Sequence, residues 1–198
     1  ALINHCDGDD VMLHLDMLEK DIMHLCCWND GKNVFIKGNA GSNLCNHMNS
    51  GSVILDGNAG WETGWFMCGG NLEIKGNAES YVGAHNQGGI IRILGDCYSF
   101  SAAHMKDGEF YVDGFVKGFI GGNISGGNIF VNQGYRMIDF QGMDKFSVKD
   151  GKGCNIYLGD VPLVLNGKLL DEKYMCGGYR SGDDYVFPGK LNSKELIF

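Results

Sequence analysis

Short segments in which apolar and polar residues alternate recur along the chain at a constant interval. The clear copies begin at residues 33, 52, 71, 90, 109 and 128, each 19 residues after the one before. Each copy places two apolar residues two positions apart, as in Val34 and Ile36. Alternation with a period of two is typical of a β-strand with one buried face. The pattern predicts a row of short strands over residues 33–132, with a degenerate copy, Phe-Ser-Val-Lys, at 146–149.

Glycines follow the same interval in two columns without slippage: Gly38, Gly57, Gly76, Gly95 and Gly114, and Gly51, Gly70, Gly89, Gly108 and Gly127. A repeat of strands and glycine corners without a 3.6-residue period is typical of one solenoid coil. Such a coil cannot bury its own apolar side, so it must stack on the next coil. The predicted fold class is all-β, a single-stranded parallel β-helix with 19-residue coils.

The segments between the strands repeat as well, in columns of small or flexible apolar residues. These columns contain Ala40, Ala59, Ala78 and Cys97, then Cys45, Gly64, Gly83 and Ala102, then Met48, Met67, Asn86 and Met105. We interpret them as inward positions, with methionine filling irregular space, and Cys45 and Cys97 as structural residues. We expect one domain over 1–198. It comprises an N-terminal cap (1–30) whose residues 10–27 form a mixed strand or short helix, repeat coils (31–149), and a closing cap with an ordered tail (150–198).

Composition and charge narrow the functional classes. Glycine accounts for 32 of 198 residues, but only 2 are proline and 44% are apolar, which excludes a collagen or a disordered linker. The net charge of −8 and the lack of a basic run argue against nucleic acid or an anionic membrane as partner. Apolar runs are too short for a membrane-spanning helix. The eight cysteines form no CxxC pair, which predicts reduced thiols and a cytoplasmic location.

One further column carries rings. It consists of Trp28, His47, Phe66, His85, His104 and then Asn123. Because the adjacent Met48 column is assigned to the core, we expect this stripe to face outward, with Trp61 and Trp65 nearby on the same turns. Three interpretations are open at this point. The stripe is a partner interface, or His85 and His104 are two ligands of a transition metal, or the stripe is a plain surface ladder.

Other candidate chemistry is weaker. His24, Cys26 and Cys27, with His14 or Cys6, contain zinc-ligand types, but their spacing matches no known zinc pattern. Glycines over 118–127 are not followed by a helix, as a phosphate loop requires. The outward acids Asp56, Glu73 and Asp113 do not stack at the repeat interval. We therefore expect no catalytic, cofactor or metal site.

The motif G-N-A-G-x3-[GC]-x2-M-x2-G-x-[ILV]-x-[ILV]-x-G, over Gly38–Gly76, resembles the GXGXG-repeat β-helix family. The best-matching stretches are Gly38–Gly41, Gly57–Gly60, Gly76–Ala78 and Gly64–Gly70. The family includes the C-terminal domain of the glutamate synthase large subunit, one of the subunits of formylmethanofuran dehydrogenase, and one of the subunits of methylamine–glutamate methyltransferase. The resemblance covers about residues 30–133 and departs from the family pattern after Gly114.

The resemblance implies a right-handed β-helix that acts as a non-catalytic scaffold within an oxidoreductase or amidotransferase complex. The expected partners are catalytic redox or amidotransferase subunits or, as a homo-oligomer, further copies of the chain. The alternative is a stand-alone carbohydrate-active or metal-dependent enzyme on a β-helix, for which a cleft of converging carboxylates or a bound metal would be the sign.

Overall fold

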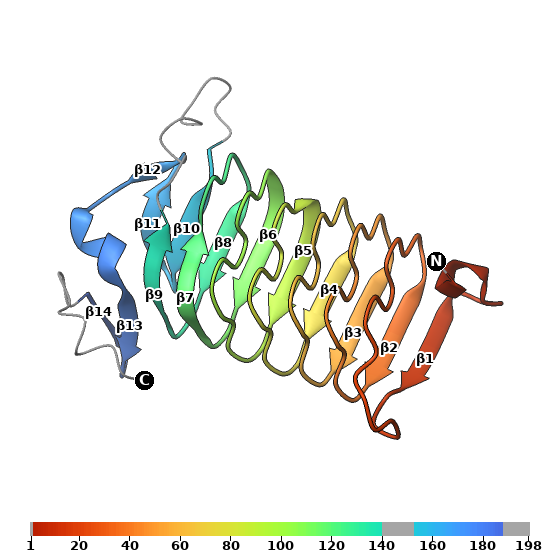
Figure 1. Cartoon of the computed structure of the whole chain (residues 1–198). Coiled ribbons are helices and arrows are strands. Elements are labelled where there is room, and N and C mark those ends of the chain that lie inside the picture. The colour runs from red at the N-terminus through yellow and green to blue at the C-terminus, as the bar shows by residue number, and fades with distance from the viewer. Residues whose placement is uncertain (1, 140–152, 188–198) are drawn as a thin grey trace.

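The chain folds into a rod of stacked coils, seen in a computed structural model that describes residues 2–139 and 153–187 (Figure 1). One long sheet runs along the rod and contains strands from every coil. Its parallel strands are β1 (Asp10–His14), β2 (Asn33–Lys37), β3 (Ser52–Asp56), β4 (Asn71–Ile74), β5 (Gln87–Ile93), β6 (Asp107–Val112), β8 (Asn128–Val131) and β10 (Asn155–Leu158). The prediction of a parallel β-helix with 19-residue coils is confirmed.

The register of the sheet reproduces the sequence repeat. Val34 pairs with Val53 and Val53 with Leu72, so residues one repeat apart lie directly above one another. In β2, β3 and β4 the two apolar positions are buried and the residues between them are half-buried. The small-residue columns are inward too, since Ala40 and Cys45 are buried, as is Met48. The core is therefore a set of parallel columns, as the alternation predicts.

A second row of parallel contacts closes each coil opposite the long sheet. In the early coils it consists of isolated bridges, which join Ile22, Ala40, Ala59, Ala78, Cys97 and Val116 in sequence. In the later coils it widens into strands β7 (Phe115–Gly121) and β9 (Gly134–Asp139), which pair in parallel. The first coils thus keep one full strand per coil, and the later coils have two.

At the N-terminal end the stacked coils begin earlier in the sequence than expected, and the cap is shorter. Within the segment assigned to a cap, β1 pairs in parallel with β2, Val11 opposite Val34, so the first coil begins at Asp10. The interval between these two strands is longer than the repeat, which hid β1 from the period. The extra residues form the loop after β1. The cap itself is the short 3₁₀ helix η1 (Leu2–His5).

The C-terminal end departs from the repeat through an insertion. The strand that pairs with β8 is β10, with Asn128 opposite Asn155, and the interval between them again exceeds the repeat. The strand predicted at 146–149 lies outside the described residues, and β10 occupies the place expected for it beside β8. Antiparallel strands β11 (Val161–Leu165) and β12 (Lys168–Leu169) then continue the long sheet. The 3₁₀ helix η3 (Glu172–Cys176) follows, and β13 (Gly178–Ser181) and β14 (Asp184–Val186) add antiparallel strands beside β9.

The two glycine columns serve different needs at the corners. Gly70, from the second column, has φ of +78°, which strongly favours glycine. Gly76, from the first column, has no such φ, but a Cβ there would lie 2.6 Å from the carbonyl oxygen of Gly57 in the preceding coil. Glycine is therefore needed in the first column mainly because successive coils approach each other closely there.

Candidate interaction surface

The ring stack is the column of Trp28, His47, Phe66, His85 and His104. Its five residues share an unusual backbone conformation. All five residues have φ between +55° and +60°. This left-handed conformation is uncommon for bulky residues and costs about 1–2 kcal/mol each. Their amides are anchored, because each donates to a carbonyl of the next coil, as His85 does to Ala103 at 2.7 Å. The coil therefore holds aromatic residues where glycine would be less strained.

The five rings lie face to face along the rod. The centroids are 4.4 Å apart for Trp28 and His47, 5.3 Å for His47 and Phe66, 4.5 Å for Phe66 and His85, and 4.5 Å for His85 and His104. No pair deviates from parallel by more than 8°. These distances follow from the interstrand spacing of about 4.8 Å. The prediction that one column of rings stacks along the rod is confirmed.

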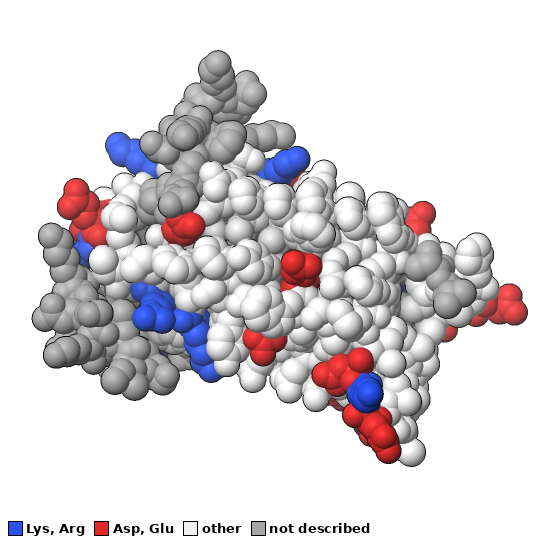
Figure 2. Space-filling view, in the orientation of Figure 1, with Lys and Arg blue, Asp and Glu red and all other residues white. Residues whose placement is uncertain are grey.

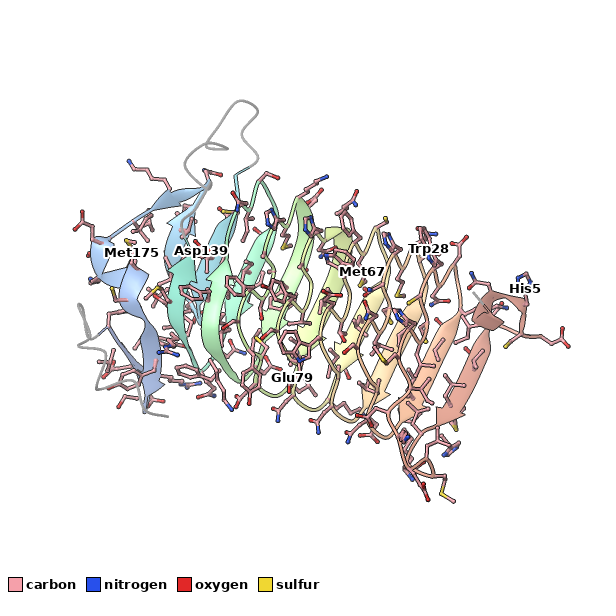
Figure 3. The ribbon with its side chains drawn as sticks, in the orientation of Figure 1. His5, Trp28, Met67, Glu79, Asp139 and Met175 are labelled. Atoms are coloured by element: carbon pink, nitrogen blue, oxygen red, sulfur yellow. The ribbon has the colours of Figure 1, made fainter. Side chains whose placement is uncertain are left out.

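The stack is open to solvent along its edges. Trp28 is 54% exposed and stands near the N-terminal end of the upper edge of the rod (Figure 3). Phe66 and His85 are half-buried, while His104 is exposed. Because the ring faces cover one another, the stack offers mainly ring edges to a partner.

The two further tryptophans, Trp65 and Trp61, differ in whether they contact the stack. Trp65 packs edge-on against the stack, with centroids 5.0 Å from Phe66 and 5.9 Å from His85. Trp61 is 54% exposed. Among the ring contacts of the described residues, none joins Trp61 to the stack. The structure thus brings six of the seven predicted residues together and leaves Trp61 apart.

Electrostatics favour the neutral form of the His85 imidazole. Burial, with the nearby charges of His104 and Lys106, lowers the pKa of His85 from its usual value. The lowered pKa favours the neutral form of the His85 ring, in which one nitrogen donates and the other accepts hydrogen bonds.

The geometry of the two histidines does not favour a shared metal ion. The lone pairs of an imidazole lie in the ring plane, and the planes of His85 and His104 are only 4° apart. Their lone pairs run side by side and do not converge on one point. Across residues 2–139 and 153–187, no group of three or more His, Cys, Asp and Glu side chains is placed to hold a metal. His24, Cys26 and Cys27 lie within these residues and do not form such a group.

Burial makes the thiols of the core cysteines unreactive. Cys97 is fully buried, and burial raises its pKa to about 12. Burial also raises the pKa of Cys154 to about 11 and that of Cys45 well above the usual value. A thiol must ionise to react as a nucleophile or bind a metal. The structural assignment of Cys45 and Cys97 agrees with this burial.

Two more ring stacks were missed by the sequence interpretation. Tyr81, Phe100 and Phe119 stack with centroids 5.0 and 5.4 Å apart. On the outer face of the long sheet, Tyr111, Phe130 and Tyr157 stack at 4.8 and 5.1 Å. Inspection of every column at the repeat interval would have found the first stack. It would not have found Tyr157, which follows the longer coil between β8 and β10.

Of the outward acids, Asp56 and Asp113 form ion pairs between coils. Asp113 accepts from Arg92 at 2.8 Å and from the side chain of Asn132 at 2.7 Å. Lys75 lies 4.0 Å from Asp56. On the face shown in Figure 2, charged residues are scattered, and uncharged surface separates them along the middle coils. These pairs tie neighbouring coils at the surface, where each contributes little stability.

Comparisons with known proteins identified no significant match to this chain. The chain matches no protein-family profile, and no significant match was found among curated proteins or solved structures. Within the described residues there is no helix long and apolar enough to cross a membrane.

Proposed function

We propose that the chain is a non-catalytic scaffold that docks a partner protein through the ring stack. The observation that supports this most is the backbone of the stack. Five bulky rings occupy left-handed positions, whereas the neighbouring inward column has the same backbone conformation but only small residues: Cys26, Cys45, Gly64, Gly83 and Ala102. Strained conformations of this kind concentrate at functional sites.

The chemistry of the stack suits a protein partner. Aromatic residues are enriched in the centres of interfaces, and rings already packed in a ladder lose little side-chain freedom on binding. The stack also lies on a rigid repeat that offers a long, straight docking edge. The partner expected from the GXGXG resemblance is a catalytic subunit of a redox or amidotransferase enzyme.

Purification of the tagged chain from its native cell under anaerobic conditions tests this function, using three matched versions. These are the unmodified chain, Phe66→Asp and Phe130→Asp. Both variants place a carboxylate in the middle of a ring stack, but Phe130 lies on the outer face of the long sheet. Mass spectrometry then identifies the proteins that remain bound to each version.

We expect a stoichiometric partner to be retained by the unmodified chain and by Phe130→Asp, and to be lost from Phe66→Asp. Circular dichroism must show that both variants still fold. Retention of the partner by folded Phe66→Asp would assign docking to another surface. Recovery of the unmodified chain with no other protein would reject the scaffold function.

A further inference from the structure

The outer edge of strand β1 carries unused backbone hydrogen-bonding groups. β1 is the last strand at the N-terminal end of the long sheet (Figure 1). The amide of Asn33 donates to the carbonyl of Asp9, and the amide of Leu15 donates to the carbonyl of Lys37, both at 2.7 Å. Odd-numbered residues therefore face β2. In a parallel strand the alternate residues then point their amide and carbonyl groups away.

The residues at this open edge are Asp10, Met12 and His14. In the described part of the chain, no backbone hydrogen bond reaches their outward amides or carbonyls. The cap η1 lies elsewhere, because the side chain of Asn4 donates to the Trp28 carbonyl at 2.8 Å and accepts from the Asp30 amide at 3.1 Å. Edge strands in natural proteins are commonly protected by proline, lysine or a bulge. β1 has none of these.

The apolar core is also incompletely covered at this end. Val11 and Leu13 continue the two core columns of the long sheet, yet both are only half-buried. Their counterparts in the next strand, Val34 and Ile36, are 3% and 0% exposed. A further strand beyond β1 would complete both the hydrogen bonding and the burial.

We propose that this strand is β1 of a second copy, paired antiparallel about a twofold axis at Met12. A twofold interface joins the same segment from both copies, so two edge strands related in this way must run antiparallel. The even-numbered residues of both copies then form hydrogen-bonded pairs, each exchanging two backbone hydrogen bonds. Met12 pairs with Met12 of the second copy, and Asp10 pairs with His14 of the second copy.

The sequence of β1, Asp-Val-Met-Leu-His, complements itself in this register. Each acidic end faces a histidine, and Val11 faces Leu13 of the second copy on the core side. A shift of two residues would place Asp10 opposite Met12 and leave His14 beyond the strand. Directly opposed side chains lie about 5 Å apart at Cβ and contribute pairwise stability. The centred register therefore satisfies both the backbone and the side chains.

The groups already beside Asp10 and His14 leave room for this pairing. One carboxylate oxygen of Asp10 accepts from the side chain of Asn33 at 3.0 Å. Nδ1 of His14 lies 3.6 Å from Asp16, whose other oxygen is 3.2 Å from Lys37. Within residues 2–139 and 153–187, no hydrogen bond or ion pair involves the second oxygen of Asp10 or the Nε2 atom of His14, so both can reach the second copy.

The outer face of the sheet supplies apolar contact at the same place. Met12 is 63% exposed and borders a shallow hollow of about 280 Å³, which Phe35 and Ile54 also line. Across the proposed axis, the Met12 side chains of the two copies lie next to each other. The hollow then continues from one copy into the other.

Sedimentation analysis of the purified chain over a range of concentrations tests the proposal. We expect a dimer. Met12→Pro removes the amide at the centre of the pairing, and proline is tolerated in an edge strand where its amide would face solvent. Because the Met12 amide does not bind β2, the circular dichroism spectrum should not change, and the dimer dissociation constant should rise about tenfold or more. Met12→Ala keeps the amide and should retain the dimer.

A charge-swap series provides a second test that does not introduce proline. Asp10→Lys places a cation opposite His14 of the second copy, and His14→Asp places two acids opposite each other, so both should weaken the dimer. The double variant Asp10→Lys/His14→Asp restores opposite charges and should recover it. A monomer at every concentration would overturn the proposal. So would a dimer that tolerates Met12→Pro and shows no recovery in the charge swap, since its contact must lie elsewhere.

Discussion

His85 and His104 lie face to face, with ring centroids 4.5 Å apart and planes 4° from parallel. The repeat places them one coil apart, and the left-handed backbone at both residues points the rings in the same direction. Burial and the nearby charges of His104 and Lys106 lower the pKa of His85, so this ring favours the neutral state. His85 therefore makes the stability of the rod sensitive to pH.

The first prediction concerns acid. The pKa of His85 is lowered from 6.5 by burial and by nearby positive charge, so below about pH 6.5 the unfolded chain binds this proton more readily than the folded one. Stability contributed by His85 is fully present above that pH and is lost as the pH falls towards the folded-state pKa. We expect His85→Phe, which keeps the stack, to lose less stability than the unmodified chain between about pH 7.5 and about pH 5.5. Urea unfolding at both pH values measures this, and equal losses would contradict it.

A second prediction concerns the glycine corner. Gly76→Val should destabilise the rod by several kcal/mol, about the upper end of single-substitution effects, because its Cβ would lie 2.6 Å from the carbonyl oxygen of Gly57. Lys75→Ala is the matched control, since Lys75 is the exposed neighbour, 4.0 Å from Asp56 and 5.5 Å from the centre of the Phe35 ring. It should change stability by less than about 1 kcal/mol. Thermal unfolding compares the two, and an unchanged melting temperature for Gly76→Val would refute the corner assignment.

The periodic part of the fold could be predicted from the sequence because every coil faces the same physical problem. Between β2 and β8 each strand must bury two apolar residues, and each coil must turn at corners that lie close to the preceding coil. The alternating apolar residues reflect the first requirement, and glycines such as Gly76 reflect the second. The ends do not repeat. The intervals from Val11 to Val34 and from Asn128 to Asn155 are both longer than the repeat, so a search at the constant interval could not find β1 or β10.

The ring stack could be predicted for the same reason, but its backbone could not. The columns showed that Phe66 and His85 share a position, and stacking follows from the strand spacing. Only Asn123, the sixth residue of the column, is of a type that indicates a left-handed φ, and its φ is +50°. Trp61 and Trp65 are both predicted beside the stack because they lie on the same turns, but among the ring contacts of the described residues only Trp65 packs against it.

A third prediction concerns the corner amides. The side-chain oxygen of Asn58 accepts from the backbone amide of Asn77 at 2.8 Å, and Asn39 does the same for Asn58 at 2.9 Å, one coil earlier. Asn58→Ala leaves the Asn77 amide without this partner and should cost about 1 kcal/mol. Asn71→Ala, which removes an exposed asparagine side chain from β4, serves as the control. Equal stability of the two variants in urea would show that the Asn58 hydrogen bond contributes nothing.

A fourth prediction concerns thiol reactivity. Cys97 is fully buried with a pKa of about 12, so it should resist alkylation in the folded chain. Cys68 is exposed and should react. Mass spectrometry after brief iodoacetamide treatment should find label on Cys68 and not on Cys97, and urea should expose both. Labelling of Cys97 in the folded chain at the rate of Cys68 would contradict the core placement.

A final prediction separates backbone strain from ring packing in the stack. Phe66 has φ of +55° and contacts the rings of His47 and His85. Phe66→Ala removes both ring contacts and keeps the Cβ that strains a left-handed backbone, whereas Phe66→Gly removes the contacts and the strain together. We therefore expect the glycine variant to be more stable than the alanine variant by about 1 kcal/mol, the reverse of their usual order in regular structure. If alanine proves the more stable, the backbone at Phe66 is relaxed, and its conformation no longer supports a functional reason for the stack.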